Sequence, residues 1–219
     1  MTFTDITPIP EKQSSLLRKW PHKELALSII SAVLLFIVSL VINHFAGSYA
    51  TARAGNHVRD IILDNIPTIN VSGIFIYGFA IFFIFVVVLM FWKPRLTPFI
   101  LKSLSLFIII RSFFICLTHI GPQPQMTFIP SGSIANLFTF TGDLFFSAHT
   151  GLPFLMALIF LKNKYLRSVF LIFSLLFGTV VLLGHYHYSI DVFSAFFITY
   201  GIYHIAKWLF KKDYNYTKI

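Results

Sequence analysis

The sequence predicts an all-α, polytopic membrane protein with six transmembrane helices and both termini in the cytoplasm. Of its 219 residues, 57% are hydrophobic and only 11% are charged, which is too apolar for an ordinary soluble domain. Six apolar runs recur along the chain, most of them long enough to cross a hydrocarbon core of roughly 30 Å. Lys and Arg are also unevenly divided between the connecting segments.

The N-terminal segment, residues 1–24, is polar and basic, contains three prolines and lacks the small-residue cleavage site of a secretory signal. We therefore expect it to be a cytoplasmic arm. Residues 25–46 form the first predicted span, followed by a more polar connection over residues 47–70. Residues 71–92 form the second span and are almost purely apolar.

A tight charged turn follows at Lys93, Pro94 and Arg95, because Pro94 disfavours continued helix. The third span is predicted over residues 96–120, with Lys102 near its start and Arg111 well inside it. Residues 121–143 are rich in Gly, Pro and Ser and contain no Lys or Arg. This composition predicts a loop.

The last three spans are predicted over residues 144–161, 168–183 and 187–210. A basic turn separates the first two, and a short turn over residues 184–186 separates the last two. Residues 211–219 form a basic tail. The domain organisation predicted is thus one six-helix catalytic domain over residues 25–210, preceded by the arm and followed by the tail.

The basic residues predict the orientation of the helices. If there are six spans, thirteen Lys and Arg lie on the face that carries both termini, and only Arg53 and Arg59 lie on the other. The positive-inside rule places the first face in the cytoplasm. The net charge of +9 is therefore explained by topology, and no continuous basic face suggests nucleic acid as a partner.

Three titratable residues lie at the exoplasmic ends of the fourth and sixth predicted spans. If helix begins by His187, then His187 and Asp191 lie one turn apart on the same face, where a carboxylate can hold an imidazole. His149 lies at the same predicted depth. Burying such groups in a membrane is costly without a partner, so they indicate a functional site. The alternative is a hydrogen-bonded pair that closes the end of the bundle.

These residue types suggest phosphoryl transfer through histidine. Asp191 can stabilise the charged form of His187 and fix its tautomer, which leaves the other ring nitrogen as a nucleophile towards phosphorus. His149 would protonate the leaving oxygen and later accept a proton from the incoming hydroxyl. Neither step needs a metal or another cofactor, and the sequence shows no clustered carboxylates or cysteines that would hold one.

Four further residues are candidates for substrate binding, each with a structural alternative. Arg111 can reach a phosphate or form a structural salt bridge. Ser147 can donate to phosphate or satisfy the helix start. His185 can be a second phosphate donor or an interfacial side chain. For Asp143 we favour capping of the fourth span through its N-terminal amides.

Two carboxylates in the first exoplasmic connection receive a structural interpretation. Asp60 and Asp64 lie one turn apart, and we expect them to form a solvated edge of the protein. In the last span, His204 is expected to be a packed polar group or to form a mid-span hydrogen bond.

Two segments resemble the catalytic motifs of sphingomyelin synthases. They are residues 142–150, GDLFFSAHT, and residues 185–192, HYHYSIDV, the latter followed by AFFIT at 195–199. Residues 111–124, with Thr118, Pro122 and Pro124, resemble the segment that precedes them, and the stretch from Asp60 to Asp64 is similar to a further motif. The likeness covers roughly residues 60–208, with Ala148 where the family usually has glycine.

The resemblance implies membership in the lipid phosphatase and phosphotransferase superfamily named for type 2 phosphatidic acid phosphatases, and an arrangement of six spans. It implies that His187 is the nucleophile, that Asp191 supports it and that His149 is the acid. Sphingomyelin synthases move phosphocholine from phosphatidylcholine to ceramide. The lipids of the membrane would then be the partners of this protein.

The segment before His187 favours a diester substrate. By resemblance, monoester phosphatases would carry a Ser-Arg pair shortly before the nucleophile, whereas this chain has Val180 and Val181 there. A diester carries one negative charge, so fewer cations suffice. We therefore expect transfer of phosphocholine or phosphoethanolamine to a lipid alcohol at the exoplasmic (periplasmic, extracellular or lumenal) surface. A lipid phosphate phosphatase or phospholipase C-like hydrolase, and a membrane scaffold or transporter without catalysis, are the alternatives.

Overall fold

A computed structural model describes residues 22–127 and 142–217 of the chain, and all regular elements within these ranges are helical. In chain order they are α2 (His22–Ala52), the 3₁₀ turn η2 (Leu63–Asn65), the π turn η3 (Ile74–Gly78), α3 (Phe79–Trp92), α4 (Thr97–Leu117), α5 (Ala148–Ile159), α6 (Lys164–Leu183), α7 (Ser189–Leu209) and α8 (Lys211–Tyr216). Most of the predicted arm and loop, residues 1–21 and 128–141, lies outside the described residues.

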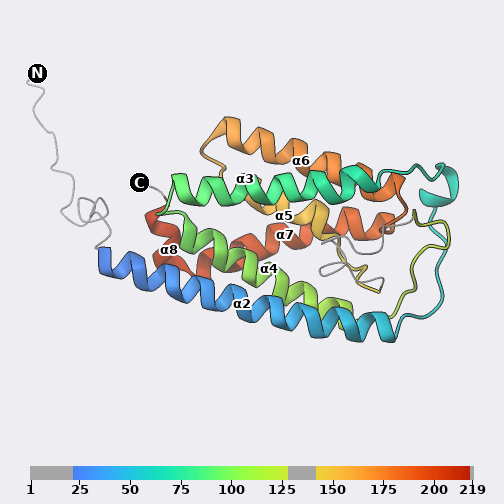
Figure 1. The fold of residues 1–219 in the computed structure, drawn as a ribbon, viewed down its shortest axis with the longest axis horizontal. Helices are drawn as coiled ribbons and strands as arrows, with labels where there is room; N and C mark the ends of the chain where they lie inside the picture. Colours follow the sequence, from blue (N-terminus) through green and yellow to red (C-terminus); the bar gives the residue numbers. More distant parts are fainter. Residues whose placement is uncertain (1–21, 128–141, 218–219) are drawn as a thin grey trace, which may run out of the picture.

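The long helices run side by side in one elongated bundle (Figure 1). α2 lies along one edge against α4, and α3 and α6 lie along the opposite edge. α5 packs between them, against α6 and α7. The start of α2 and the end of α8 lie at the same end of the bundle, as Figure 1 shows.

Five helices are long and apolar enough to cross a membrane: α2, η3 with α3, α4, α6 and α7. The prediction of an all-helical chain with membrane spans is confirmed in this form. The fourth predicted span is different, because α5 has only 12 residues, or about 18 Å at 1.5 Å per residue. It begins at Ala148 rather than at residue 144. Non-helical backbone within a membrane, as expected for the residues directly before α5, is tolerated when other parts of the protein bury it.

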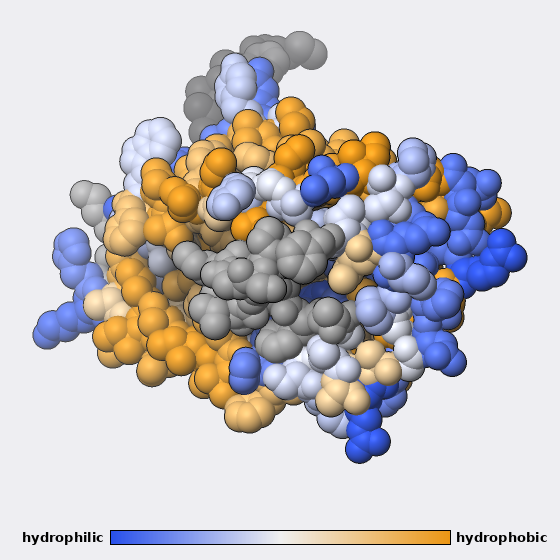
Figure 2. Space-filling model, turned by 45° about the vertical axis from the view of Figure 1, so that its right-hand side comes forward, coloured by the Kyte–Doolittle hydropathy of each residue, from blue (hydrophilic) through white to orange (hydrophobic). Residues whose placement is uncertain are grey.

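Apolar side chains cover much of the outside of the bundle. In α2, which packs mainly against α4, Leu27, Leu34 and Phe45 are exposed. Figure 2 shows hydrophobic residues over the side of the bundle and hydrophilic residues gathered at the right of the view. Hydrocarbon tails rather than water can solvate such a surface, which agrees with an integral membrane protein.

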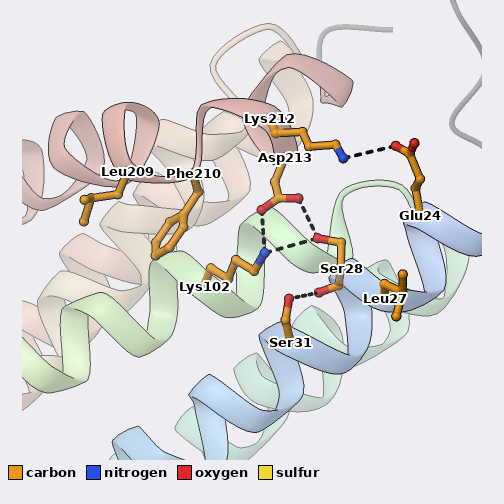
Figure 3. Close-up of a pocket in the computed structure, with 9 residues that line it drawn as sticks. All are labelled: Glu24, Leu27, Ser28, Ser31, Lys102, Leu209, Phe210, Lys212 and Asp213. Carbon is orange, nitrogen blue, oxygen red and sulfur yellow. Dashed lines mark hydrogen bonds and ion pairs between the residues drawn. The ribbon is translucent and has the colours of Figure 1, made fainter.

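A polar cluster ties α2, α4 and α8 together at the end where α2 begins (Figure 3). Lys102 donates to Asp213 at 2.7 Å and to Ser28 at 3.1 Å, and Ser28 donates to Asp213 at 2.6 Å. The cluster borders a pocket of about 400 Å³. Lys212 pairs with Glu24 across the same pocket. Both lysines in the pocket wall are therefore neutralised by carboxylates.

Candidate active site

The start of α7 brings His187 and Asp191 together, although the helix begins later than predicted. α7 starts at Ser189 with Tyr188 as its N-cap, so His187 precedes the helix. Asp191 is the third helical residue, and its Oδ2 accepts the backbone N–H of Tyr188 at 3.0 Å. The same oxygen lies 3.4 Å from His187 Nδ1. The pair therefore meets through a helix cap that reaches backwards, and not through one shared helical face.

His187 presents its two ring nitrogens differently. Nδ1 faces the Asp191 carboxylate at ion-pair distance but has no hydrogen-bond partner among the described residues. The ring is 6% exposed. A carboxylate on Nδ1 favours the tautomer in which Nε2 carries the free lone pair. Nε2, in contrast, forms no ion pair with this carboxylate.

The start of α5 holds the second half of the candidate site, and Ser147 is its N-cap. Ser147 Oγ accepts the backbone N–H of Thr150 at 3.4 Å. The prediction that Asp143 caps this helix is therefore wrong. Asp143 lies four residues before the cap and pairs with Arg111 instead. The structure thus shows the helix-start role of Ser147.

Arg111 holds the segment that leads into α5. From α4, its guanidinium donates to the Asp143 carboxylate, to the Asp143 carbonyl at 3.0 Å and to the Phe146 carbonyl at 2.6 Å. The side chain is buried, as is most of Asp143. Of the two roles considered for Arg111, the structure shows the salt bridge, which fixes the backbone just before His149.

Aromatic rings fix the plane of His149. Its imidazole is stacked between Phe75 and Phe79, with centroid distances of 4.1 and 3.9 Å. Both phenylalanines come from the π turn η3 and the start of α3, and π turns occur often at functional sites. The sequence reasoning missed these two rings.

A backbone hydrogen bond joins the two halves of the site. Ser147 N–H, two residues before His149, donates to the carbonyl of Asp191 at 3.0 Å.

Gly178 of α6 lies beside the starts of α5 and α7. A Cβ at this position would lie 3.3 Å from Val192 and 3.4 Å from Thr150, the residues that directly follow Asp191 and His149. The segments that carry His149, His187 and Asp191 therefore pack against one another, and the convergence of the three side chains on one substrate stays a prediction.

His185 lies beside this site in the turn between α6 and α7. It is only 2% exposed, which does not fit the interfacial alternative. Nδ1 lies 3.4 Å from the hydroxyl of Thr68, and Nε2 is buried without a hydrogen-bond partner among the described residues. The φ angle of His185 is positive, at 55°. The preceding residue is Gly184, where a Cβ would lie 2.4 Å from the ring of Tyr186.

The expectation that Asp60 belongs to a solvated edge is wrong. Asp60 is 7% exposed, and its carboxylate accepts backbone N–H groups of Ile62, Leu63 and Ser189. Burial raises its pKa, but these hydrogen bonds outweigh that effect and hold the pKa below its ordinary value. Asp64 is more exposed and pairs with Arg59. No local signal separates the two, because the N–H of Ser189 comes from a distant part of the chain.

Within the described ranges, no group of three or more His, Cys, Asp or Glu is placed to hold a metal ion. No curated protein matches the chain. Residues 141–208 match a family model described as PAP2 superfamily C-terminal, and this segment contains His149, His187 and Asp191. Over these residues, which are less than half of the chain, the protein is similar to the PAP2 superfamily, and the apolar helices agree with an integral membrane protein.

Proposed function

We propose that this protein transfers a phospho-headgroup from a glycerophospholipid to a lipid alcohol, in the manner of sphingomyelin synthases. The observation that carries the proposal is the hydrogen bond from Ser147 N–H to the Asp191 carbonyl. It fixes the segment of His149 against the first turn of α7, which begins two residues after His187, and so supports a site in which one phosphorus atom lies between the two imidazoles.

In the first half of the reaction, His187 Nε2 attacks the phosphorus of the donor phospholipid. The new N–P bond forms as the bond from phosphorus to the diacylglycerol oxygen breaks. His149 gives its proton to that oxygen, so neutral diacylglycerol leaves. The Asp191 carboxylate beside Nδ1 stabilises the positive charge that develops on the His187 ring.

In the second half, the hydroxyl of a lipid alcohol attacks the phosphorus on His187. Neutral His149 accepts the hydroxyl proton as the new O–P bond forms and the N–P bond breaks. This step restores both histidines to their initial protonation states. The stacking of His149 between Phe75 and Phe79 would hold its ring in one orientation through both steps.

The surroundings of His187 support a diester donor. Val180 and Val181 are buried in apolar contacts before the turn, where a cationic side chain would be needed to clamp a monoester. Three of the donor groups of Arg111 are engaged with Asp143 and Phe146. A phosphate with one negative charge needs less compensation than one with nearly two.

The assay that tests the proposal uses the purified protein in liposomes with headgroup-labelled phosphatidylcholine, phosphatidylethanolamine or phosphatidate, each with and without ceramide. Labelled product that forms from a diester only when ceramide is present is the expected result. Free phosphocholine or phosphoethanolamine without ceramide would indicate the phospholipase C-like alternative, and free phosphate from phosphatidate would indicate a phosphatase.

The variants His187→Ala and His149→Ala are expected to abolish turnover while the protein still accumulates in the membrane. Turnover at the wild-type rate in either variant would refute the mechanism. The absence of turnover with every substrate in the wild-type protein would favour a scaffold or transporter.

A further inference from the structure

The first exoplasmic connection reaches the start of α7 through a buried carboxylate. Asp60 Oδ2 accepts the backbone N–H of Ser189, the first helical residue, at 2.7 Å. Its Oδ1 accepts the N–H groups of Ile62 at 2.9 Å and Leu63 at 3.2 Å. The first N–H groups of a helix have no partner within the helix, so an external acceptor determines where the helix begins.

The hydroxyl of Tyr188 also holds this turn, through one hydrogen bond to the same connection and one to another segment. The hydroxyl of Tyr188 accepts the N–H of Val58 at 3.1 Å and donates to the carbonyl of Gly121 at 2.7 Å. Tyr188 follows His187 directly. The backbone from His187 to Ser189 is thus held between Asp191 on one side and the connection around Asp60 on the other.

We propose that Asp60 is a positioning residue of the active site, which holds the turn bearing His187 in the geometry required for attack on phosphorus. This inference rests on the proposed function. Among the described residues, Asp60 forms no hydrogen bond or ion pair with His187 or Asp191; it acts through the backbone of Ser189.

Removal of this carboxylate has a defined physical effect. The N–H of Ser189 would lose its acceptor in a partly buried position, which is unfavourable, so the turn would shift to satisfy it. The contact of 3.4 Å between His187 and Asp191 would then loosen. A misplacement of about 1 Å in a reacting group lowers the rate on the order of a hundredfold.

The test compares Asp60→Ala with Asp64→Ala in the liposome assay. Asp64 is a matched control, because it lies in the same connection but pairs with the exposed Arg59. We expect Asp60→Ala to lower kcat about tenfold to a hundredfold with little change in KM. Asp64→Ala should keep the wild-type kcat. Both proteins should elute as single species in detergent.

A double variant separates positioning from a general loss of structure. Asp60→Ala combined with Ser189→Pro removes the orphaned N–H, and proline is well suited to the first helical position. We expect the double variant to recover most of the lost kcat. Equal kcat in Asp60→Ala and Asp64→Ala, no recovery in the double variant, or failure of both Asp60 variants to fold would overturn the inference.

The two proposals fail in different ways. If the wild-type protein transfers no headgroup, the proposed function is wrong. If the wild-type protein is active and His187→Ala is inactive, but Asp60→Ala retains the wild-type kcat, only the role of Asp60 is wrong.

Discussion

The ion pair between Arg111 and Asp143 gives the sharpest prediction about stability. Arg111→Ala removes the donors to the Asp143 carboxylate, the Asp143 carbonyl and the Phe146 carbonyl. The side chain of Asp143 is only 10% exposed, so its charge would remain buried without its partner. Breaking a buried pair in this way costs about 3–5 kcal/mol.

Unfolding in mild detergent, followed by circular dichroism during heating and during titration with a denaturing detergent, measures this loss. Asp143→Asn removes the charge from the other side and should destabilise the protein less, because Arg111 keeps two carbonyl acceptors. The double variant Arg111→Ala with Asp143→Asn should be more stable than the sum of the single losses predicts. The free energy of unfolding of Arg111→Lys should lie between those of the wild type and Arg111→Ala, since an ammonium group cannot reproduce the planar fork of a guanidinium.

The opposite outcome would identify a different role. If Arg111 binds the phosphate of the substrate instead, Arg111→Ala would keep the wild-type unfolding transition and raise KM for the donor lipid. That result would refute the argument that Arg111 acts by fixing the backbone before His149.

Three further predictions concern packing, pH and catalysis. Gly151→Ala should lower the free energy of unfolding by about 1–3 kcal/mol, because the new Cβ would lie 2.7 Å from the Phe107 ring and 2.8 Å from the Thr199 hydroxyl; Gly201→Ala, where nothing lies within 4 Å, is the control for the same detergent unfolding. The lowered pKa of Asp60 should stabilise the protein above pH of about 4, the ordinary pKa of an aspartate, and this contribution should disappear as the pH falls through the folded-state pKa. Tm measured between pH 3 and 7 should therefore change less with pH in Asp60→Asn than in the wild type, and equal slopes of Tm against pH would contradict the cause given. Asp191→Asn should lower kcat at least about a hundredfold in the liposome assay with little effect on expression, and a kcat near that of the wild type would remove Asp191 from the mechanism.

The sequence predicted the long helices well, because each is specified by its own composition. α3, α4, α6 and α7 agree with the predicted spans to within a few residues at most ends, whereas α2 continues to Ala52, six residues beyond the predicted end of the first span. α5 was predicted too long, since Leu144, Phe145 and Phe146 continue its apolar run without a local stop signal. Their backbone is instead held by Arg111, which lies more than thirty residues earlier in the chain.

Separation along the sequence also explains which parts of the candidate site could be predicted. His187 and Asp191 are close in sequence, so their proximity could be predicted even though the helix begins two residues later than expected. Asp60 could not be assigned in this way, because its partner Ser189 lies 129 residues away. Phe75 and Phe79 resemble any other apolar residues of a membrane span until the fold places His149 between them.

The most direct test of the central claim is to locate the covalent intermediate. The wild-type protein and the His149→Ala and His187→Ala variants are mixed with headgroup-labelled phosphatidylcholine without an acceptor, quenched at alkaline pH and analysed by peptide mass spectrometry. We expect the phospho-headgroup on His187 in the wild-type protein, and no label in His187→Ala. Label on another residue, or turnover in His187→Ala, would contradict the transfer of the headgroup through His187.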